Sequence, residues 1–350
     1  MNTMNSKVFD IILLLALPAS GKSETRQFMA RIDPEKLAAE YHVGENVQLD
    51  DFPYVFIMRR IDEELVKLGE PRVYYPGETP FYDGRDWGTL IQLLNEDYLD
   101  LIDHAAHNGG QYPALPDGAC PAAHLMFKRL EKAAAKAGIS PRLAGISKEI
   151  LNKVAEGIED ECYKMFKDKL WAMPQSLEGK TVIMELSRGG PDGAEMPLTG
   201  TCGYQYSLAQ FCPEILERAK ILYIWVTPEE SRRKNEARAD PNDPGSSLHH
   251  MTPVAVMMAD YGCDDMLYLA SQSGKPDTVS IVCTADGKVY DLPIGVFDNR
   301  DDKTTFLREE PETWPEDKIE DFGKTLKKVT DTMNGSGTTG TDCLNKQEED

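Results

Sequence analysis

The stretch Val8-Phe-Asp-Ile-Ile-Leu-Leu-Leu-Ala-Leu-Pro-Ala-Ser-Gly-Lys-Ser23 decides the fold, because it joins a buried strand to a loop of small residues and a helix start. The backbone N–H groups of such a loop surround a phosphate, and the helix that follows offers its positive N-terminal end. Gly21 would let the backbone approach the ligand, Lys22 would reach the β- and γ-phosphates, and Ser23 would hold Mg²⁺. The sequence therefore predicts a site for ATP or GTP, formed by Pro18, Ala19, Ser20, Gly21, Lys22, Ser23 and Glu24.

One position departs from the usual pattern of a triphosphate-binding loop. Ala16 stands where the first glycine of the pattern is expected. An alanine is accommodated there if its φ angle is not positive. The segment from Glu24 to Ile32 is compatible with a helix, so we expect a strand, a phosphate loop and a helix in that order.

The same segment has some features of a secretory signal peptide, with Lys7 ahead of the apolar residues 11–17. Asp10 interrupts the front of the apolar run, and Leu17 would occupy the −3 position of the cleavage site, where a small residue is preferred. The run is also shorter than the roughly 20 apolar residues of a membrane span. We therefore expect a phosphate loop here and no membrane segment.

Composition narrows the possible partners and location. The 350 residues are 41% hydrophobic, enough to form the core of one large domain or two ordinary ones. The formal net charge of −21 argues against nucleic acid and anionic membranes as partners, because phosphate contacts need clustered Lys and Arg. The seven cysteines include no C-x-x-C pair, which indicates reduced thiols in the cytoplasm. The sequence leaves the oligomeric state open.

Short apolar segments separated by helix-length stretches predict an α/β fold with a doubly wound, mostly parallel sheet. Together with the phosphate loop, such a sheet resembles the P-loop NTPase type. Besides the strand at 8–15, four further segments have the pattern of buried parallel strands: 46–51, 181–186, 221–226 and 279–283. Ligands of such sheets bind at the carboxyl ends of the strands.

The stretch between the second and third predicted strands is too long for one crossover helix. Helical patterning at 55–68, 90–106, 122–137 and 146–170 predicts a helical insertion over residues 55–179, which serves as a possible substrate or lid region. The α/β core would then comprise 1–54 and 180–332, followed by a disordered tail at 333–350. The aromatic and Pro/Gly-rich segment 74–87 inside the insertion is either a substrate lid or a packed surface loop.

Two acidic residues at predicted strand ends are candidates for chemistry. Asp50 could accept the proton of an acceptor hydroxyl during phosphoryl transfer, or it could cap the helix that follows. Glu185 lies late in an apolar strand, where a carboxylate can hold the Mg²⁺ shell. The alternative for Glu185 is a structural ion pair with Arg188 or Lys22.

A basic helix is predicted after the fourth strand. It starts with Thr227 as N-cap, and Arg238 could present a guanidinium group to the transferred phosphoryl. The alternative is a solvated face whose arginines pair with Glu229, Glu230 and Glu236. The turn-rich segment 240–253 that follows could form a mobile lid, and its adjacent His249 and His250 lack metal-ligand spacing.

The phosphate loop, the strand-end Asp50-Asp-Phe52 and the segment 227–238 together resemble the nucleoside and nucleotide kinase group of P-loop NTPases. The resemblance implies that Lys22 and Ser23 bind the triphosphate and Mg²⁺. The Asp-x-Phe resembles uridine-kinase-like members, which implies that Asp50 is the base. We expect a kinase that transfers the γ-phosphoryl group to a small hydroxyl- or phosphate-bearing metabolite. An NTP hydrolase coupled to a protein partner and a non-catalytic nucleotide-binding regulator remain alternatives.

Overall fold

A computed structural model describes residues 8–107, 116–118, 121–237 and 251–336. The chain forms two compact units. The sheet unit comprises residues 1–48 and 178–350, and the helical unit comprises residues 49–177.

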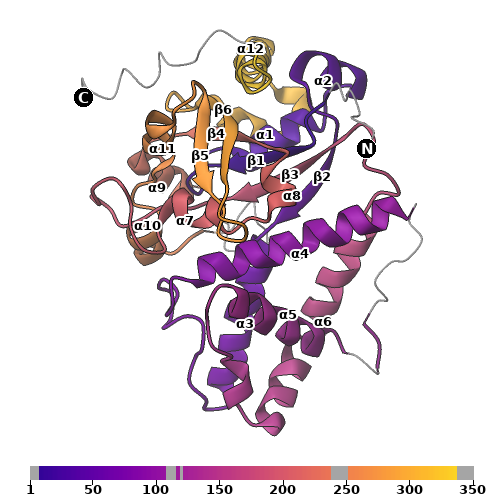
Figure 1. Cartoon of the computed structure of the whole chain (residues 1–350), viewed down its shortest axis with the longest axis vertical. Coiled ribbons are helices and arrows are strands. Elements are labelled where there is room, and N and C mark those ends of the chain that lie inside the picture. Colours follow the sequence, from indigo (N-terminus) through magenta and orange to yellow (C-terminus); the bar gives the residue numbers. More distant parts are fainter. Residues whose placement is uncertain (1–7, 108–115, 119–120, 238–250, 337–350) are drawn as a thin grey trace. The chain divides into compact units, whose positions relative to one another are not determined.

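The fold is α/β, with a six-stranded, mostly parallel sheet in the order β2-β3-β1-β4-β6-β5 (Figure 1). β1 is parallel to β3 and to β4, and β4 is parallel to β6. The strands span Ile11–Leu15 (β1), Glu45–Asp50 (β2), Lys180–Leu186 (β3), Ala219–Trp225 (β4), Thr278–Val282 (β5) and Val289–Asp298 (β6). The arrangement is compatible with a doubly wound fold.

The prediction for the fifth strand was wrong in one respect, because β5 runs antiparallel to β6. The reason is a tight turn, in which Cys283 N donates to Lys288 O at 2.9 Å, so the chain folds straight back on itself. β6 was not among the strands predicted from the sequence. Pro293 and Gly295 interrupt its apolar pattern, and both residue types are rare inside strands.

Helices cover both faces of the sheet, which explains why all five residues of β1 are buried. Apolar residues of α1 (Lys22–Met29), α2 (Pro34–Tyr41) and α12 (Glu316–Met333) form one core with the strands. On the opposite face, α7 (Gly203–Ala209) brings Tyr204 to 6.5 Å from the ring of Tyr223 on β4. The unit also contains α8 (Pro213–Leu216), α9 (Pro228–Ala237), α10 (Val254–Asp260), α11 (Met266–Gln272), η2 (Thr305–Arg308) and η3 (Pro311–Thr313).

The strand order makes the carboxyl end of β1 a topological switch point. From β1 the chain continues to β2, on the β3 side of β1, whereas from β3 it crosses to β4 on the other side. Connections that leave in opposite directions open a crevice at the carboxyl ends of the strands, and ligands of α/β sheets bind there. The loop after β1 lies at this place.

The helical unit has its own apolar core, formed by residues such as Tyr54, Ile61, Leu93 and Phe127. Its elements are α3 (Phe52–Lys67), α4 (Asp86–Ala106), α5 (Ala122–Lys136), η1 (Leu143–Gly145) and α6 (Lys148–Ala172). The four α-helices lie where the sequence pattern predicted helices. None of the described helices is both long and apolar enough to cross a membrane.

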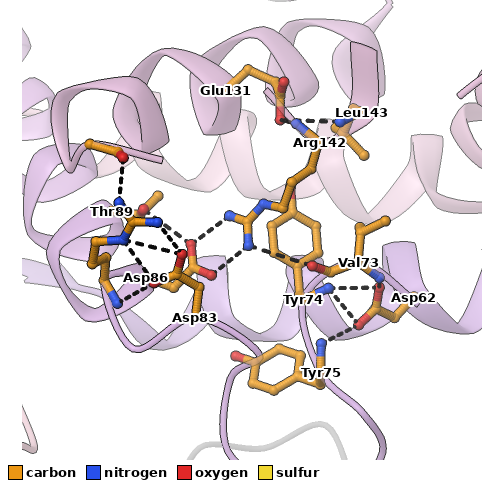
Figure 2. A network of polar contacts seen from close by, with 12 residues as sticks. Asp62, Val73, Tyr74, Tyr75, Asp83, Asp86, Thr89, Glu131, Arg142 and Leu143 are labelled. Atoms are coloured by element: carbon orange, nitrogen blue, oxygen red, sulfur yellow. Dashed lines mark hydrogen bonds and ion pairs between the residues drawn. The ribbon is translucent and has the colours of Figure 1, made fainter. Parts of the chain in front are cut away.

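The segment 74–87 in the helical unit is held by buried polar contacts (Figure 2). Asp62 accepts hydrogen bonds from the amides of Val73 and Tyr75 at 2.6 and 2.7 Å. Arg142 pairs with both carboxylate oxygens of Asp86 at 2.6 Å. Tyr74 and Tyr75 are 1% and 3% exposed. At both ends of the segment, the contacts favour the packed-loop interpretation over the lid.

Candidate functional site

The loop after β1 has the backbone conformation that its sequence suggested. Gly21 has φ 105° and caps the start of α1 in the left-handed region, where glycine is favoured. A Cβ at Gly21 would lie 2.6 Å from Thr304 Oγ1, so only glycine fits against this neighbour. Ala19 also has a positive φ of 57°, whereas Ala16 does not. The alanine at the first glycine position is therefore accommodated without strain.

The carbonyl oxygens of the loop are held by surrounding protein. Pro18 O accepts a hydrogen bond from Ser231 Oγ of α9 at 2.7 Å. Ser20 O accepts one from Asn299 Nδ2 at 2.8 Å, and Gly21 O accepts from a threonine of α1 at 2.9 Å. Because C=O and N–H of a trans peptide point in opposite directions, each contact turns the next N–H away from the contacting side chain.

The amide N–H groups of the same loop differ from its carbonyl groups in their hydrogen bonding. Within the described parts of the chain, no protein acceptor contacts the N–H groups of Ala19, Ser20 or Gly21. Backbone N–H donors of this kind, next to the start of a helix, are groups that bind anions. The loop can therefore accept the oxygens of a phosphate group.

The side chain of Lys22 remains close to the loop. Its ammonium group donates to Ala16 O and Leu17 O, each at 3.3 Å, and to Ser187 Oγ at 2.6 Å. The residue is only 7% exposed. Ser187 follows the end of β3, so the neighbouring strand helps to place the cation beside the loop. An ammonium group here can neutralise phosphate oxygens.

Ser23 and Glu24, predicted to contact Mg²⁺ and the nucleotide, occupy the first turn of α1. The carboxylate of Glu24 is 7% exposed and pairs with Arg308 of η2 at 2.5 Å. Ser23 is half-buried. Glu24 is thus engaged by a protein cation, whereas Ser23 directly follows Lys22 at the helix start.

Glu185 forms an ion pair, although with a different partner from those considered above. Its Oε2 lies 2.9 Å from a guanidinium nitrogen of Arg26 on α1, and both side chains are largely buried. In the described residues, no group of three or more His, Cys, Asp or Glu side chains is arranged to hold a metal ion. A Mg²⁺ ion at this loop would take most of its ligands from phosphate oxygens and water, as Mg²⁺ commonly does.

Asp50 ends β2 and belongs to the helical unit. Its Oδ1 accepts a hydrogen bond from the amide of Phe52, the first residue of α3, at 2.8 Å. This contact agrees with the capping interpretation.

Helix α9 begins as the sequence predicted. Thr227 Oγ1 accepts a hydrogen bond from the amide of Glu230 at 3.2 Å, which is the expected N-cap. Arg232 pairs with Glu229 at 3.1 Å and Arg233 pairs with Glu230 at 2.7 Å, so these two arginines match the ion-paired interpretation. Arg238, the segment 240–250 and its two histidines lie outside the described residues.

Sequence reasoning missed the side chains that hold the loop in place. Ser231, Thr304 and Asn299 are 0–1% exposed, and all three come from segments more than 200 positions after the loop. Asn299 follows β6, the strand that was not predicted. A single polar residue after an unrecognised strand gives no local signal.

Comparison of the chain with family models, curated proteins and solved structures found no match.

Proposed function

We propose that the protein is a P-loop phosphotransferase. It binds ATP or GTP with Mg²⁺ at residues 16–23 and transfers the γ-phosphoryl group to a small hydroxyl- or phosphate-bearing metabolite. The observation that carries this proposal is the loop after β1, whose carbonyls are held by the protein and whose amides contact no described protein acceptor. Its place at the switch point of the sheet supports the same assignment.

Phosphoryl transfer needs positioning and charge neutralisation more than covalent chemistry. The loop amides and the N-terminus of α1 bind the β-phosphate, and Lys22 leaves its carbonyl contacts to reach the β- and γ-phosphates. Ser23 and Glu185 would hold Mg²⁺, which would screen the charge of the phosphates when bound. The ion pair with Arg26 holds the carboxylate of Glu185 in a fixed orientation.

Asp50 is the proposed base of the reaction. Its carboxylate follows β2 and is oriented by the amide of Phe52. In this role it accepts the proton of the acceptor hydroxyl, which becomes a nucleophile for the γ-phosphorus. We further propose that Arg238 stabilises the charge of the transferred group.

The decisive experiment is ADP release from Mg·ATP by the full chain, alone and with pooled nucleosides, nucleotides, sugars and cofactor precursors. We expect acceptor-dependent release that Lys22→Ala lowers by at least about a hundredfold, since the variant lacks the phosphate-binding cation. Lys36→Ala, at an exposed lysine of α2 in the same unit, is the matched control and keeps full activity.

The outcomes separate this proposal from its rivals. Lys22-dependent release without any acceptor indicates an NTP hydrolase, and tight binding without turnover indicates a regulator. Equal activity of the wild type and Lys22→Ala would overturn the site itself. For the base, we expect Asp50→Asn to lower the rate of transfer and leave nucleotide affinity unchanged.

A further inference from the structure

Asn299 joins two loops of the sheet unit at the carboxyl ends of β1 and β6. The residue is fully buried. Its Nδ2 donates to Ser20 O at 2.8 Å and to Thr304 Oγ1 at 2.9 Å, and its Oδ1 accepts from Lys303 N at 2.7 Å. Its own amide donates to Trp225 O at 2.9 Å. Every polar group of the side chain is thus engaged, so its orientation is fixed.

The contact with Ser20 O determines the orientation of one particular peptide group. The carbonyl of Ser20 and the N–H of Gly21 belong to the same planar trans peptide, so they point in opposite directions. When Asn299 holds the carbonyl, the N–H of Gly21 must point away from Asn299. Thr304, the other acceptor of the carboxamide, fills the space against Gly21 and limits its movement.

We propose that Asn299 is a positioning residue of the phosphate loop. It holds the Ser20–Gly21 peptide so that the Gly21 N–H meets a phosphate oxygen of the bound triphosphate. This inference rests on the proposed function. Without the carboxamide, the Ser20 carbonyl is free to turn inward, where it repels the anionic ligand and removes a donor.

The test measures the affinity of the full chain for Mg·ATP and for inorganic tripolyphosphate by calorimetry. Asn299→Ala and Asn299→Asp remove the donor. We expect both to weaken binding by about tenfold to a hundredfold, as for a lost hydrogen bond to a charged group. Tripolyphosphate should lose as much affinity as ATP, because the contact concerns the phosphates alone.

Thr181→Val is the matched control. Thr181 is also fully buried, and its hydroxyl bridges the backbone of Phe9 and Gly44 at 2.7 and 2.8 Å. It lies at the start of β3, at the other end of the sheet from the loop. The variant loses two buried hydrogen bonds, so it reports what general destabilisation alone does to binding.

The pH dependence of Asn299→Asp separates positioning from a merely structural role. When the introduced carboxyl group is protonated, it can again donate to Ser20 O. The affinity of this variant relative to wild type should therefore recover as the pH falls from 8 to 5, whereas Asn299→Ala shows no such recovery.

The possible results are distinct. Lost affinity in both Asn299 variants with recovery only for Asn299→Asp, while Thr181→Val binds normally, supports the proposal. Normal binding by the Asn299 variants while Lys22→Ala fails to bind overturns it and leaves the proposed function intact. Failure of the wild type to bind either probe overturns both. If Asn299→Ala does not fold, the proposal is tested by the affinity of Asn299→Asp relative to wild type as a function of pH.

Discussion

At the scale of single residues, Asp264 is a partly buried residue whose carboxyl group accepts two hydrogen bonds from the protein. Tyr223 Oη donates to its Oδ2 at 2.8 Å, and Met266 N donates to its Oδ1 at 3.0 Å. Burial is the main cause that raises its pKa from 3.8 to about 6, and the neighbouring charge of Asp265 adds to the effect. The group is therefore protonated more readily in the folded chain than in the unfolded chain.

This shift predicts a pH dependence of stability. Because the folded pKa is the higher one, the contribution of Asp264 is fully present below pH 3.8 and is lost as the pH rises to about 6. Over this pH range the loss in the free energy of unfolding amounts to about 3 kcal/mol. The Asp264→Asn variant lacks this titrating group. In urea unfolding, its free energy of unfolding relative to wild type should therefore be higher at pH 7 than at pH 4. A constant difference would contradict the assignment.

A second prediction for single residues concerns the ion pair between Arg26 of α1 and Glu185 of β3. Arg26→Met and Glu185→Gln should each lower the free energy of unfolding by about 1–2 kcal/mol, since both remove one partner of a largely buried pair. The double variant should lose less than the sum. A double-mutant cycle by urea unfolding measures the coupling, and strict additivity would show that the pair contributes nothing.

At the scale of elements, Asp62 shows how one side chain fixes a loop without regular structure. It is fully buried on α3 and accepts the amides of three successive residues, Val73, Tyr74 and Tyr75. Burial is the main cause that raises the pKa of its carboxyl group, and the amide contacts counteract it. The loop between α3 and α4 therefore depends on this carboxylate (Figure 2).

Replacing Asp62 should loosen that loop. We expect Asp62→Ala to lower the free energy of unfolding by about 3 kcal/mol, because it leaves several buried amides without an acceptor. Asp83→Ala, in the same loop and 28% exposed at its side chain, is the control and should cost less than about 1 kcal/mol. Chemical denaturation of both variants checks the difference, and equal losses would refute the role of Asp62.

At the scale of the whole molecule, the chain has separate apolar cores in its two units. Separate cores allow separate unfolding transitions. Mg·ATP at about 100 times its dissociation constant should stabilise the sheet unit by about 2.7 kcal/mol and leave the helical unit unchanged. Scanning calorimetry with and without nucleotide measures this, and Asp62→Ala identifies the transition of the helical unit. A single transition that moves as a whole would contradict the prediction.

Local sequence patterns were sufficient for most of the elements. The apolar run before Ala16 and the periodicity of the insertion mark strands and helices from neighbouring residues alone, and the α/β class with a mostly parallel sheet was confirmed. β6 was missed and β5 was assigned the wrong direction. Pro293 and Gly295 weaken the local signal of β6, and only its place between β4 and β5 identifies it as a strand.

The sequence by itself determined the strand, the small-residue loop, the lysine and the helix start, because these features depend on residues adjacent along the chain. Tertiary structure alone decided which way the loop's peptide groups face. Ser231 and Asn299 hold the carbonyls of Pro18 and Ser20 from across the fold. The likewise unforeseen partner of Glu185 is Arg26. Such contacts join residues that the sequence separates by 159 to 279 positions, and only packing of the sheet and helices brings them together.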